Sequence, residues 1–242
     1  MPGDAVETDN IARQMAVFRQ GWRTYRKVVD NNYMYHREVY GLLRSSLATA
    51  FPDHALRLLD VGCGDASVMA PALGGLRMEH YYGIDSSAPA IELAREALAG
   101  LDCTVTLQRA DFATALAHWA EPLDAIWIGQ CLHHLQSADK LIAMRQMRRI
   151  LGGRGLLLIW EPSHLESETH DDWMARFERN CRSFWSVMSQ AEWDAMYDHC
   201  RDADYSETPA DWLALGRAAG FADAEELLET PTQLSRVYRF GN

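Results

Sequence analysis

Short hydrophobic runs alternate with amphipathic segments along most of the chain. Five runs have the pattern of buried strands: 57–61, 81–85, 104–108, 123–129 and 155–160. Three segments between them carry apolar residues at the spacing of three and four that is typical of helices: 65–73, 88–100 and 137–151. Because strands that alternate with helices form βαβ units, we expect a doubly wound α/β fold with a mostly parallel sheet.

Two stretches depart from this alternation, and it resumes after the second. Residues 11–50 are helical in pattern, and 163–206 are helical but rich in large aromatic side chains. A helix at 209–221 and two weaker strands, near 222–228 and 233–240, complete a seven-stranded sheet. The predicted organisation is therefore an N-terminal helical cap, an α/β core in two pieces and an aromatic-rich lid insert: 1–54, 55–162 with 207–242, and 163–206.

Composition narrows the class of protein. The 242 residues are 48% hydrophobic and 24% charged, which is ordinary for a globular protein. The longest apolar run, GLLLIW, is far shorter than the roughly 20 residues of a membrane span, so we expect no membrane partner. MPGDAVETDN lacks the basic region of a secretory signal, and five cysteines without a CxxC pair favour reduced thiols. These features predict a cytoplasmic protein and leave its oligomeric state open.

Charge bears on the choice of partner. The net charge of −11 argues against a nucleic-acid partner, because proteins that bind a phosphate backbone usually present a basic face. The charge is uneven, with seven basic against three acidic residues in 11–54 and four against eleven in 161–206. The basic segment keeps an RNA substrate open as an alternative.

A glycine turn follows the first strand, in the stretch LLDVGCGDAS at 58–67. Glycines at this point let a ligand approach the backbone and the start of the next helix. The dinucleotide fingerprint needs a third glycine where this chain has Ser67, and the phosphate-loop motif is absent. Gly62 and Gly64 alone are also compatible with a plain tight turn.

Three acids strengthen the binding interpretation. Asp60 ends the first strand, Asp85 ends the second, and Asp111, with Phe112 beside it, follows the third. The carboxyl ends of parallel strands line one crevice, so these side chains should meet there. An acid at the end of the second strand suits a ribose diol, and an acid beside the turn suits an ammonium group. Phe112 offers a ring for a purine.

This set of motifs resembles the class I S-adenosylmethionine-dependent methyltransferases, which have a Rossmann-like fold. LLDVGCGDAS is similar to their first motif, YYGIDSS to their ribose-binding acid and ADF to their adenine-side motif. LDAIWIGQCLHHL and LGGRGLLLIWEP are similar to the fourth and fifth strands of the family. The resemblance covers 56–162 and, by pattern, 207–240. One departure is Ala66, where many members have a third glycine.

The resemblance implies S-adenosylmethionine as cofactor, with S-adenosylhomocysteine as product. Asp60 and the glycine turn would hold the methionine part, Asp85 the ribose, and Asp111 with Phe112 the adenine. The full set of expected cofactor residues is Asp60, Gly62, Cys63, Gly64, Asp85, Ser86, Asp111, Phe112 and Gln130.

The acceptor side is less defined. The residues after the fourth strand, Gly129-Gln130-Cys131-Leu132, do not match the motif of the base-amino methyltransferases of this family. His133 and His134 follow, and we expect His133 to face the crevice as a general base or polar orienter while His134 is packed. An equally weighted alternative is that the two histidines only fix the start of the helix that follows. Glu161 would pair with His133, hold a cationic acceptor or cap the next segment, and Tyr33 is a further catalytic candidate.

The expected reaction is methyl transfer to an O, N, C or S atom of a small metabolite. The aromatic insert is the only reason to favour an aromatic or heterocyclic acceptor, and its aromatic residues also suit a simple core. Expected substrate residues are Tyr25, His36, Trp160 and Trp185; no metal site is expected, although His164, His170 and Asp171 lie close in sequence. Alternatives are an RNA or protein methyltransferase, a catalytically silent cofactor-binding partner, a nicotinamide oxidoreductase and a Rossmann-like core with an empty crevice.

Overall fold

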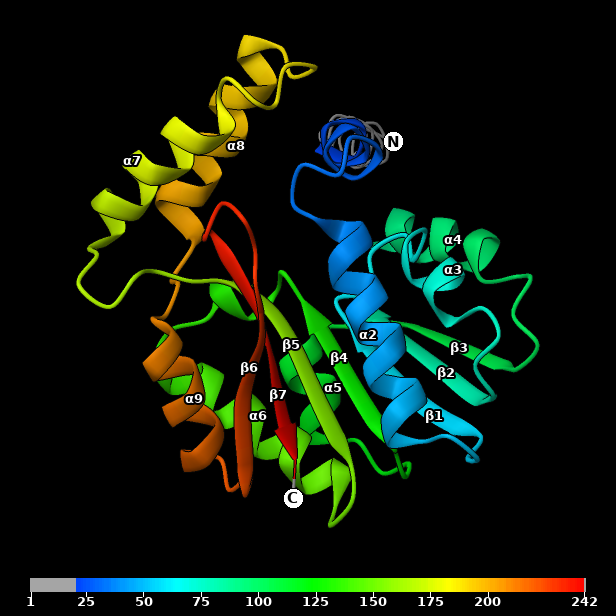
Figure 1. The fold of residues 1–242 in the computed structure, drawn as a ribbon. Coiled ribbons are helices and arrows are strands. Elements are labelled where there is room, and N and C mark those ends of the chain that lie inside the picture. Colours follow the sequence, from blue (N-terminus) through cyan, green and yellow to red (C-terminus); the bar gives the residue numbers. More distant parts are fainter. Residues whose placement is uncertain (1–20, 242) are drawn as a thin grey trace, which may run out of the picture.

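The computed structural model describes residues 21–241 and has a single seven-stranded sheet (Figure 1). The strand order is β3-β2-β1-β4-β5-β7-β6. Of these strands, β7 alone runs in the direction opposite to the other six. The strands are β1 Leu56–Val61, β2 Met78–Asp85, β3 Thr104–Arg109, β4 Ala125–Gly129, β5 Leu156–Pro162, β6 Asp223–Glu229 and β7 Ser235–Gly241. The predicted doubly wound, mostly parallel sheet is confirmed.

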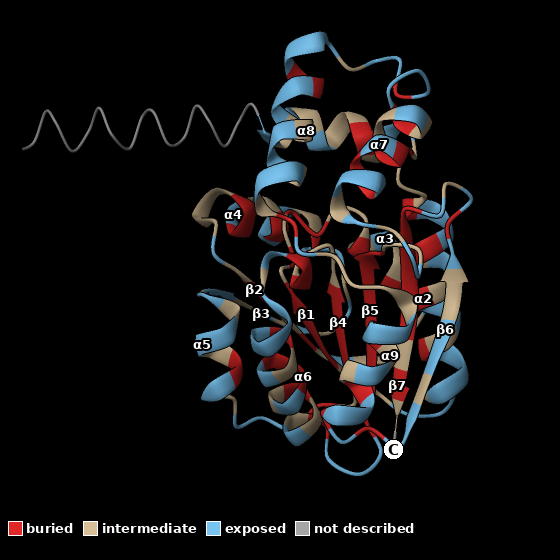
Figure 2. Ribbon diagram, turned by 90° about the vertical axis from the view of Figure 1, so that its left-hand side faces the viewer, coloured by how far each residue is buried: buried red, intermediate tan, exposed pale blue. Residues whose placement is uncertain are grey.

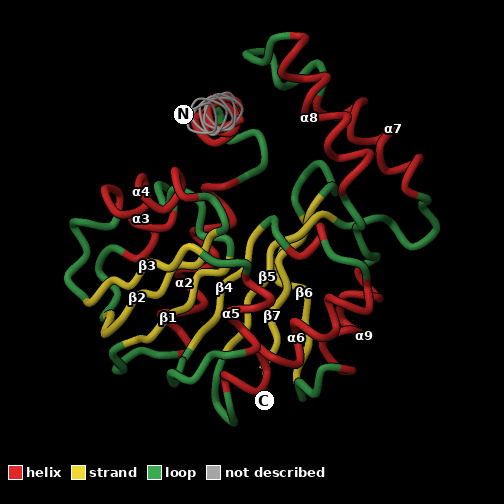
Figure 3. Tube along the Cα trace, turned by 180° about the vertical axis from the view of Figure 1, so that it is seen from behind, coloured by secondary structure: helices red, strands yellow, loops and turns green. Residues whose placement is uncertain are grey.

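Helices cover both faces of the sheet, as the front and rear views show (Figures 1 and 3). One face carries α2 His36–Ala50, α3 Met69–Leu73 and α4 Ala88–Ala97; the other carries α5 Phe112–Ala117, α6 Ser137–Leu151 and α9 Pro209–Ala218. Successive strand residues point to opposite faces, so Ile126 packs in one hydrophobic cluster and Trp127 in the other. This explains why β4 is apolar throughout its length. Strands β1, β4, β5 and β7 form the buried centre, whereas β3, β6 and the outer helix faces are half-buried or exposed (Figure 2).

Two helical predictions differ from the structure in their lengths. The expected helix over 11–50 is interrupted, because residues 21–30 are helical and a turn separates them from α2. Asn32 and Tyr35 adopt left-handed φ angles of 55° and 65° in that turn. Residues 11–20 lie outside the described part. The helix expected from 65 begins only at α3, since Ala66 has a φ of 51°. The short helix α5 was not expected.

The insert, residues 163–206, forms two helices above the carboxyl ends of the strands (Figure 1). These are α7 His170–Cys181 and α8 Gln190–Ala203, and each begins with a capping box. Trp173, Phe177 and Trp185 pack with Val28 and Tyr33 in a third hydrophobic cluster. The helical insert is therefore attached to the residues that precede α2, and both lie at the same edge of the sheet.

The base of the insert is closed by backbone contacts. Ser163 forms a bridge with Glu207, and the His164 N–H donates to the Glu207 carbonyl at 3.1 Å. The Lys140 ammonium, fully buried, pairs with the Glu207 carboxylate at 2.8 Å. The two chain crossings between core and insert thus lie side by side.

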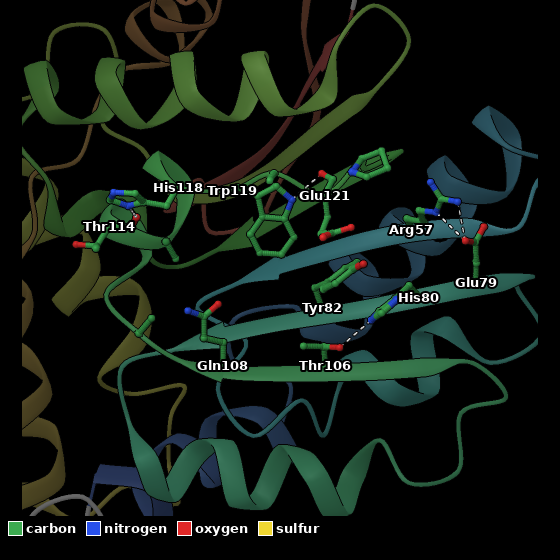
Figure 4. Close-up of a pocket in the computed structure, with 14 residues that line it drawn as sticks. Arg57, Glu79, His80, Tyr82, Thr106, Gln108, Thr114, His118, Trp119 and Glu121 are labelled. Atoms are coloured by element: carbon green, nitrogen blue, oxygen red, sulfur yellow. Dashed lines mark hydrogen bonds and ion pairs between the residues drawn. The ribbon is translucent and has the colours of Figure 1, made fainter.

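A hollow of about 920 Å³ lies on the sheet face beside β2 and β3 (Figure 4). Its polar groups pair with one another: Arg57 with Glu79, and the His80 ring with the Thr106 hydroxyl at 2.8 Å. It extends along the sheet face from Glu79 near the start of β2 to Gln108 near the end of β3, and the glycine turn after β1 is not part of its lining. No helix in the described residues is long and apolar enough to cross a membrane.

Candidate functional site

The glycine turn after β1 presents backbone to open space. Gly62 and Gly64 have φ angles of 69° and 54°, which favour glycine. A Cβ on Gly62 would lie 2.9 Å from the Cys131 sulfur, whereas a Cβ on Gly64 would meet nothing within 4 Å. Gly64 therefore leaves room for a ligand to reach the backbone.

Asp85 links this turn to the end of β2. Its carboxylate accepts the Gly64 N–H at 3.0 Å with one oxygen and the Ser87 N–H at 2.7 Å with the other. The carbonyl of Ser86, the residue between Asp85 and Ser87, accepts a hydrogen bond from the Arg109 guanidinium. The strand-end acid thus lies beside the glycine turn, as the sequence predicts.

Asp60 is buried behind the turn rather than open to the crevice. The Tyr81 hydroxyl donates to it at 2.6 Å. Burial raises the pKa of Asp60 to about 7, although the Tyr81 hydrogen bond opposes the shift. Cys63 is buried as well, with 8% exposure. These two residues support the turn from behind.

Asp111 and Phe112 lie at the end of β3. Asp111 caps α5 by accepting the Thr114 N–H at 2.9 Å, and Phe112 is half-buried against the core. The Ala110 N–H donates to the Asp85 carbonyl, which brings the two strand ends together. The glycine turn, Asp85 and Asp111 therefore lie at one edge of the sheet. Their carboxylates and open backbone suit a nucleoside that carries a charged tail.

Asp65 was missed by the sequence analysis. It is 7% exposed, and its carboxylate accepts the Trp22 indole N–H at 3.1 Å and the Ser67 N–H at 3.0 Å. The Arg26 guanidinium is 3.8 Å away. The acid is visible within the turn sequence, but nothing in the sequence pairs it with Trp22. Residues 21–30 are thereby tied to the glycine turn.

A cavity of about 700 Å³ separates the insert from the sheet edge. Gln130 and His133 contribute to it from the end of β4, and Tyr25, Tyr33 and Trp185 form part of its aromatic wall. Gln130 has a φ of 55°, and its amide donates to the Trp160 carbonyl. Five expected site residues therefore meet at this cavity.

Two other expected residues, Trp160 and His36, have structural contacts, and so does the wall residue Tyr33. Trp160 and His36 pack edge to face in the interior, and neither lines the cavity. The Trp160 indole donates to the Ser235 hydroxyl, and burial lowers the pKa of His36 to about 4. Tyr33 stacks on Trp185 at 5.4 Å between ring centroids, and its hydroxyl accepts the Val187 N–H. Trp160 and His36 thus support the cavity wall from behind, and Tyr33 belongs to the wall itself.

Glu161 is fully buried, and its carboxylate contacts the backbone of residues 131–133 and the His133 ring. One oxygen accepts the N–H groups of Cys131 and Leu132, and the other accepts the His133 N–H and lies 2.7 Å from His133 Nδ1. Burial lowers the pKa of His133, but the hydrogen bond and charge of Glu161 outweigh it and raise the pKa overall. Glu161 cannot touch an acceptor directly.

His134 differs from its expected position. We expected it to be packed, but its side chain is 42% exposed, while that of His133 is 7% exposed. The pair lies in a 3₁₀ turn, Leu132–His134, in which Leu132 and His133 take the buried places. Both rings line the cavity.

Residues 58–155 match a family model described as a methyltransferase domain. The plantazolicin methyltransferase BpumL with S-adenosylhomocysteine is 15% identical, with a TM-score of 0.62 over 90% of this chain and 88% of that one. Magnesium protoporphyrin IX methyltransferase from Synechocystis PCC 6803, with S-adenosylmethionine bound, is also 15% identical. Its TM-score is 0.56, and the match covers 90% of this chain and 84% of that one.

The S-adenosylmethionine-dependent methyltransferase SibL is 18% identical, with a TM-score of 0.55 over 78% of this chain, which spans 51% of SibL. In all, 1043 solved chains match, so this likeness identifies the fold and does not single out an acceptor. No curated protein matches by sequence.

Proposed function

We propose that the chain is an S-adenosylmethionine-dependent methyltransferase of class I and that it methylates a small aromatic or heterocyclic molecule, which the match of 58–155 to a methyltransferase-domain model and the shared fold support. The observation that carries the proposal is the 700 Å³ cavity between the insert and the carboxyl end of β4. Its size and its largely apolar wall, to which Tyr25, Tyr33 and Trp185 contribute aromatic rings, are typical of sites for small molecules. The cavity borders the edge at which the cofactor residues meet.

The cofactor would lie along the ends of β1, β2 and β3. Gly62 and Gly64 would bring backbone to its methionine part, Asp85 would accept hydrogen bonds from the ribose, and Asp111 with Phe112 would border the adenine. When bound, S-adenosylmethionine supplies an electrophilic methyl group. The buried Asp60, which accepts the Tyr81 hydroxyl, would support the turn from behind.

The chain would contribute mainly by aligning the acceptor. The aromatic wall would hold a flat ring and exclude water, and His133, fixed by Glu161, would supply a polar group at the edge of β4. Correct alignment of two reactants can account for a large part of a rate enhancement. In this proposal, methyl transfer would rest on alignment of the acceptor rather than on proton removal by His133.

Methyl-labelled cofactor and fractionated metabolite extracts provide the test. We expect label to enter a small molecule. Once that molecule is known, Ala195→Trp should raise its KM at least tenfold, because exposed Ala195 lines the cavity and a large side chain would fill it. Cofactor affinity should stay within about twofold.

The matched control is Ala210→Trp, since Ala210 is an exposed helical residue outside the cavity. It should leave both constants unchanged. Label in RNA or protein rather than in a small molecule would refute the proposal, and so would an unchanged KM in the Ala195 variant.

A further inference from the structure

Four polar side chains converge where the insert meets the core. His133 and His134 follow β4, while His199 belongs to α8 and Asp204 follows it. One Asp204 oxygen, Oδ1, lies 3.5 Å from His133 Nε2, 3.5 Å from His134 Nδ1 and 4.0 Å from His199 Nε2. Two segments that are about 70 residues apart in sequence thus supply one cluster.

The central oxygen has no hydrogen-bond partner in the described residues. Asp204 Oδ1 is buried, and the Asp204 side chain is only 5% exposed. A buried carboxylate oxygen without a partner costs free energy, so such an atom calls for an explanation. The three imidazole nitrogens around it are too distant to form strong hydrogen bonds with it.

The spacing suits a shared metal ion. Bonds of 2.0–2.2 Å in a tetrahedral site place neighbouring ligand atoms about 3.3–3.6 Å apart. The two 3.5 Å separations fall in this range. In the described part of the chain, only His133, His134 and Asp204 bring three such ligand atoms within 4.8 Å of one another.

The surroundings of His133 also favour a ligand role. Because Glu161 lies 2.7 Å from Nδ1, that nitrogen carries the proton that it donates, and Nε2 is directed to Asp204. Metal-binding histidines commonly donate their second ring N–H to a carboxylate, which fixes the tautomer and the orientation of the ring. His134 Nδ1 makes only a long contact, 3.5 Å, with the Ala203 carbonyl, which binding would replace.

We propose that His133, His134 and Asp204 bind a divalent transition-metal ion, for which Zn²⁺ is the best match, with His199 as the nearest additional ligand. Imidazole nitrogens favour such ions over Mg²⁺. This inference departs from the expectation that the chain has no metal site, and it makes His133 a ligand instead of a base. The ion would join the insert to the core in the wall of the cavity; any contact with an acceptor rests on the proposed function.

Metal binding is tested without any acceptor. Chelator-treated protein that carries no histidine tag is titrated with Zn²⁺ by calorimetry, and Co²⁺ is used as a spectroscopic probe. We expect one ion per chain with a dissociation constant of micromolar or below, visible Co²⁺ bands of a tetrahedral site, and a higher melting temperature with metal. Asp204→Asn should weaken Zn²⁺ binding at least 100-fold.

His118→Ala is the matched control, because His118 is an exposed histidine outside the cluster and its loss should change nothing. If Asp204→Asn fails to fold, His199→Ala, which changes an exposed side chain, should still alter the Co²⁺ spectrum or weaken binding. Absence of 1:1 binding by the unmodified chain, or equal affinity in all variants, would overturn the proposal. Either result would leave the methyl-transfer assay unaffected.

Discussion

The two halves of the ligand-binding edge are built in different ways. At the ends of β1, β2 and β3, polar groups pair with the backbone of the same adjoining strand ends, as Asp85 does with Gly64 and Ser87. At the ends of β4 and β5, the walls come from segments that are distant in sequence, and Asp204 Oδ1 has no hydrogen-bond partner among the described residues. The first half is thus largely complete in itself, whereas the second is organised around groups that a ligand would satisfy.

Glu161 should show the largest effect, because it organises the second half. Glu161→Gln replaces a fully buried carboxylate that faces four donor groups, so we expect the free energy of unfolding to fall by about 3–5 kcal/mol. Urea unfolding measures this. Glu225→Gln, in an exposed position on β6, should cost less than about 0.5 kcal/mol. A loss below 1 kcal/mol for Glu161→Gln would contradict the central role of this carboxylate.

Asp85 tests the first half. Asp85→Ala should weaken S-adenosylmethionine binding about 100-fold, or about 2.7 kcal/mol, because the ribose would lose a charged acceptor. Asp85→Asn should lose less, since an amide oxygen can still accept the Gly64 N–H. Calorimetry compares both with Glu79→Ala, which alters an exposed residue of the same strand. Unchanged affinity in Asp85→Ala would remove the ribose assignment, and tighter binding of NAD than of S-adenosylmethionine would remove the cofactor assignment.

Glu192 joins the insert to residues 21–30 and gives a pH-dependent effect. A hydrogen bond from Lys27, supported by Ser189, lowers the pKa of Glu192 to about 2. Since the carboxylate is held charged in the folded state, its contribution is complete above pH of about 4.5 and disappears as the pH falls toward 2. Glu192→Gln should therefore cost about 1–2 kcal/mol at pH 7 and much less near pH 2.

Melting curves of the Glu192 variant and the parent chain at several pH values measure this difference. Glu178→Gln is the control, because Glu178 pairs with Arg182 on the exposed surface and should contribute little at any pH. A Glu192 effect that did not shrink on acidification would show that packing, rather than charge, joins these segments.

Hydrogen exchange should reveal the smallest effect. S-Adenosylhomocysteine should slow exchange in residues 21–30, since Trp22 and Arg26 contact Asp65 beside the glycine turn. We also expect added protection in α7 and α8, with no change in β6 as the reference. If neither segment responded, the insert and the N-terminal helix would be a fixed wall and not a cover that closes.

The first half of the site was predictable because its residues follow one another along the chain. Parallel strands bring Asp85 and Asp111 to one edge, and the pattern of each strand locates its end. Asp204 was not predictable, because no periodicity relates the end of α8 to the turn after β4. Trp160 resembled a cavity residue from its place at the end of β5, but strand alternation directs its ring to the interior.

The closed base of the insert has a consequence for how such enzymes diversify. Because Ser163 and Glu207 bridge the two crossings, the segment between them begins and ends at nearly the same point. A loop anchored in this way can change length at small entropic cost. Under the proposed function, residues 164–206 can be replaced as one unit, which would change the acceptor that fits the cavity while the glycine turn and Asp85 stay in place.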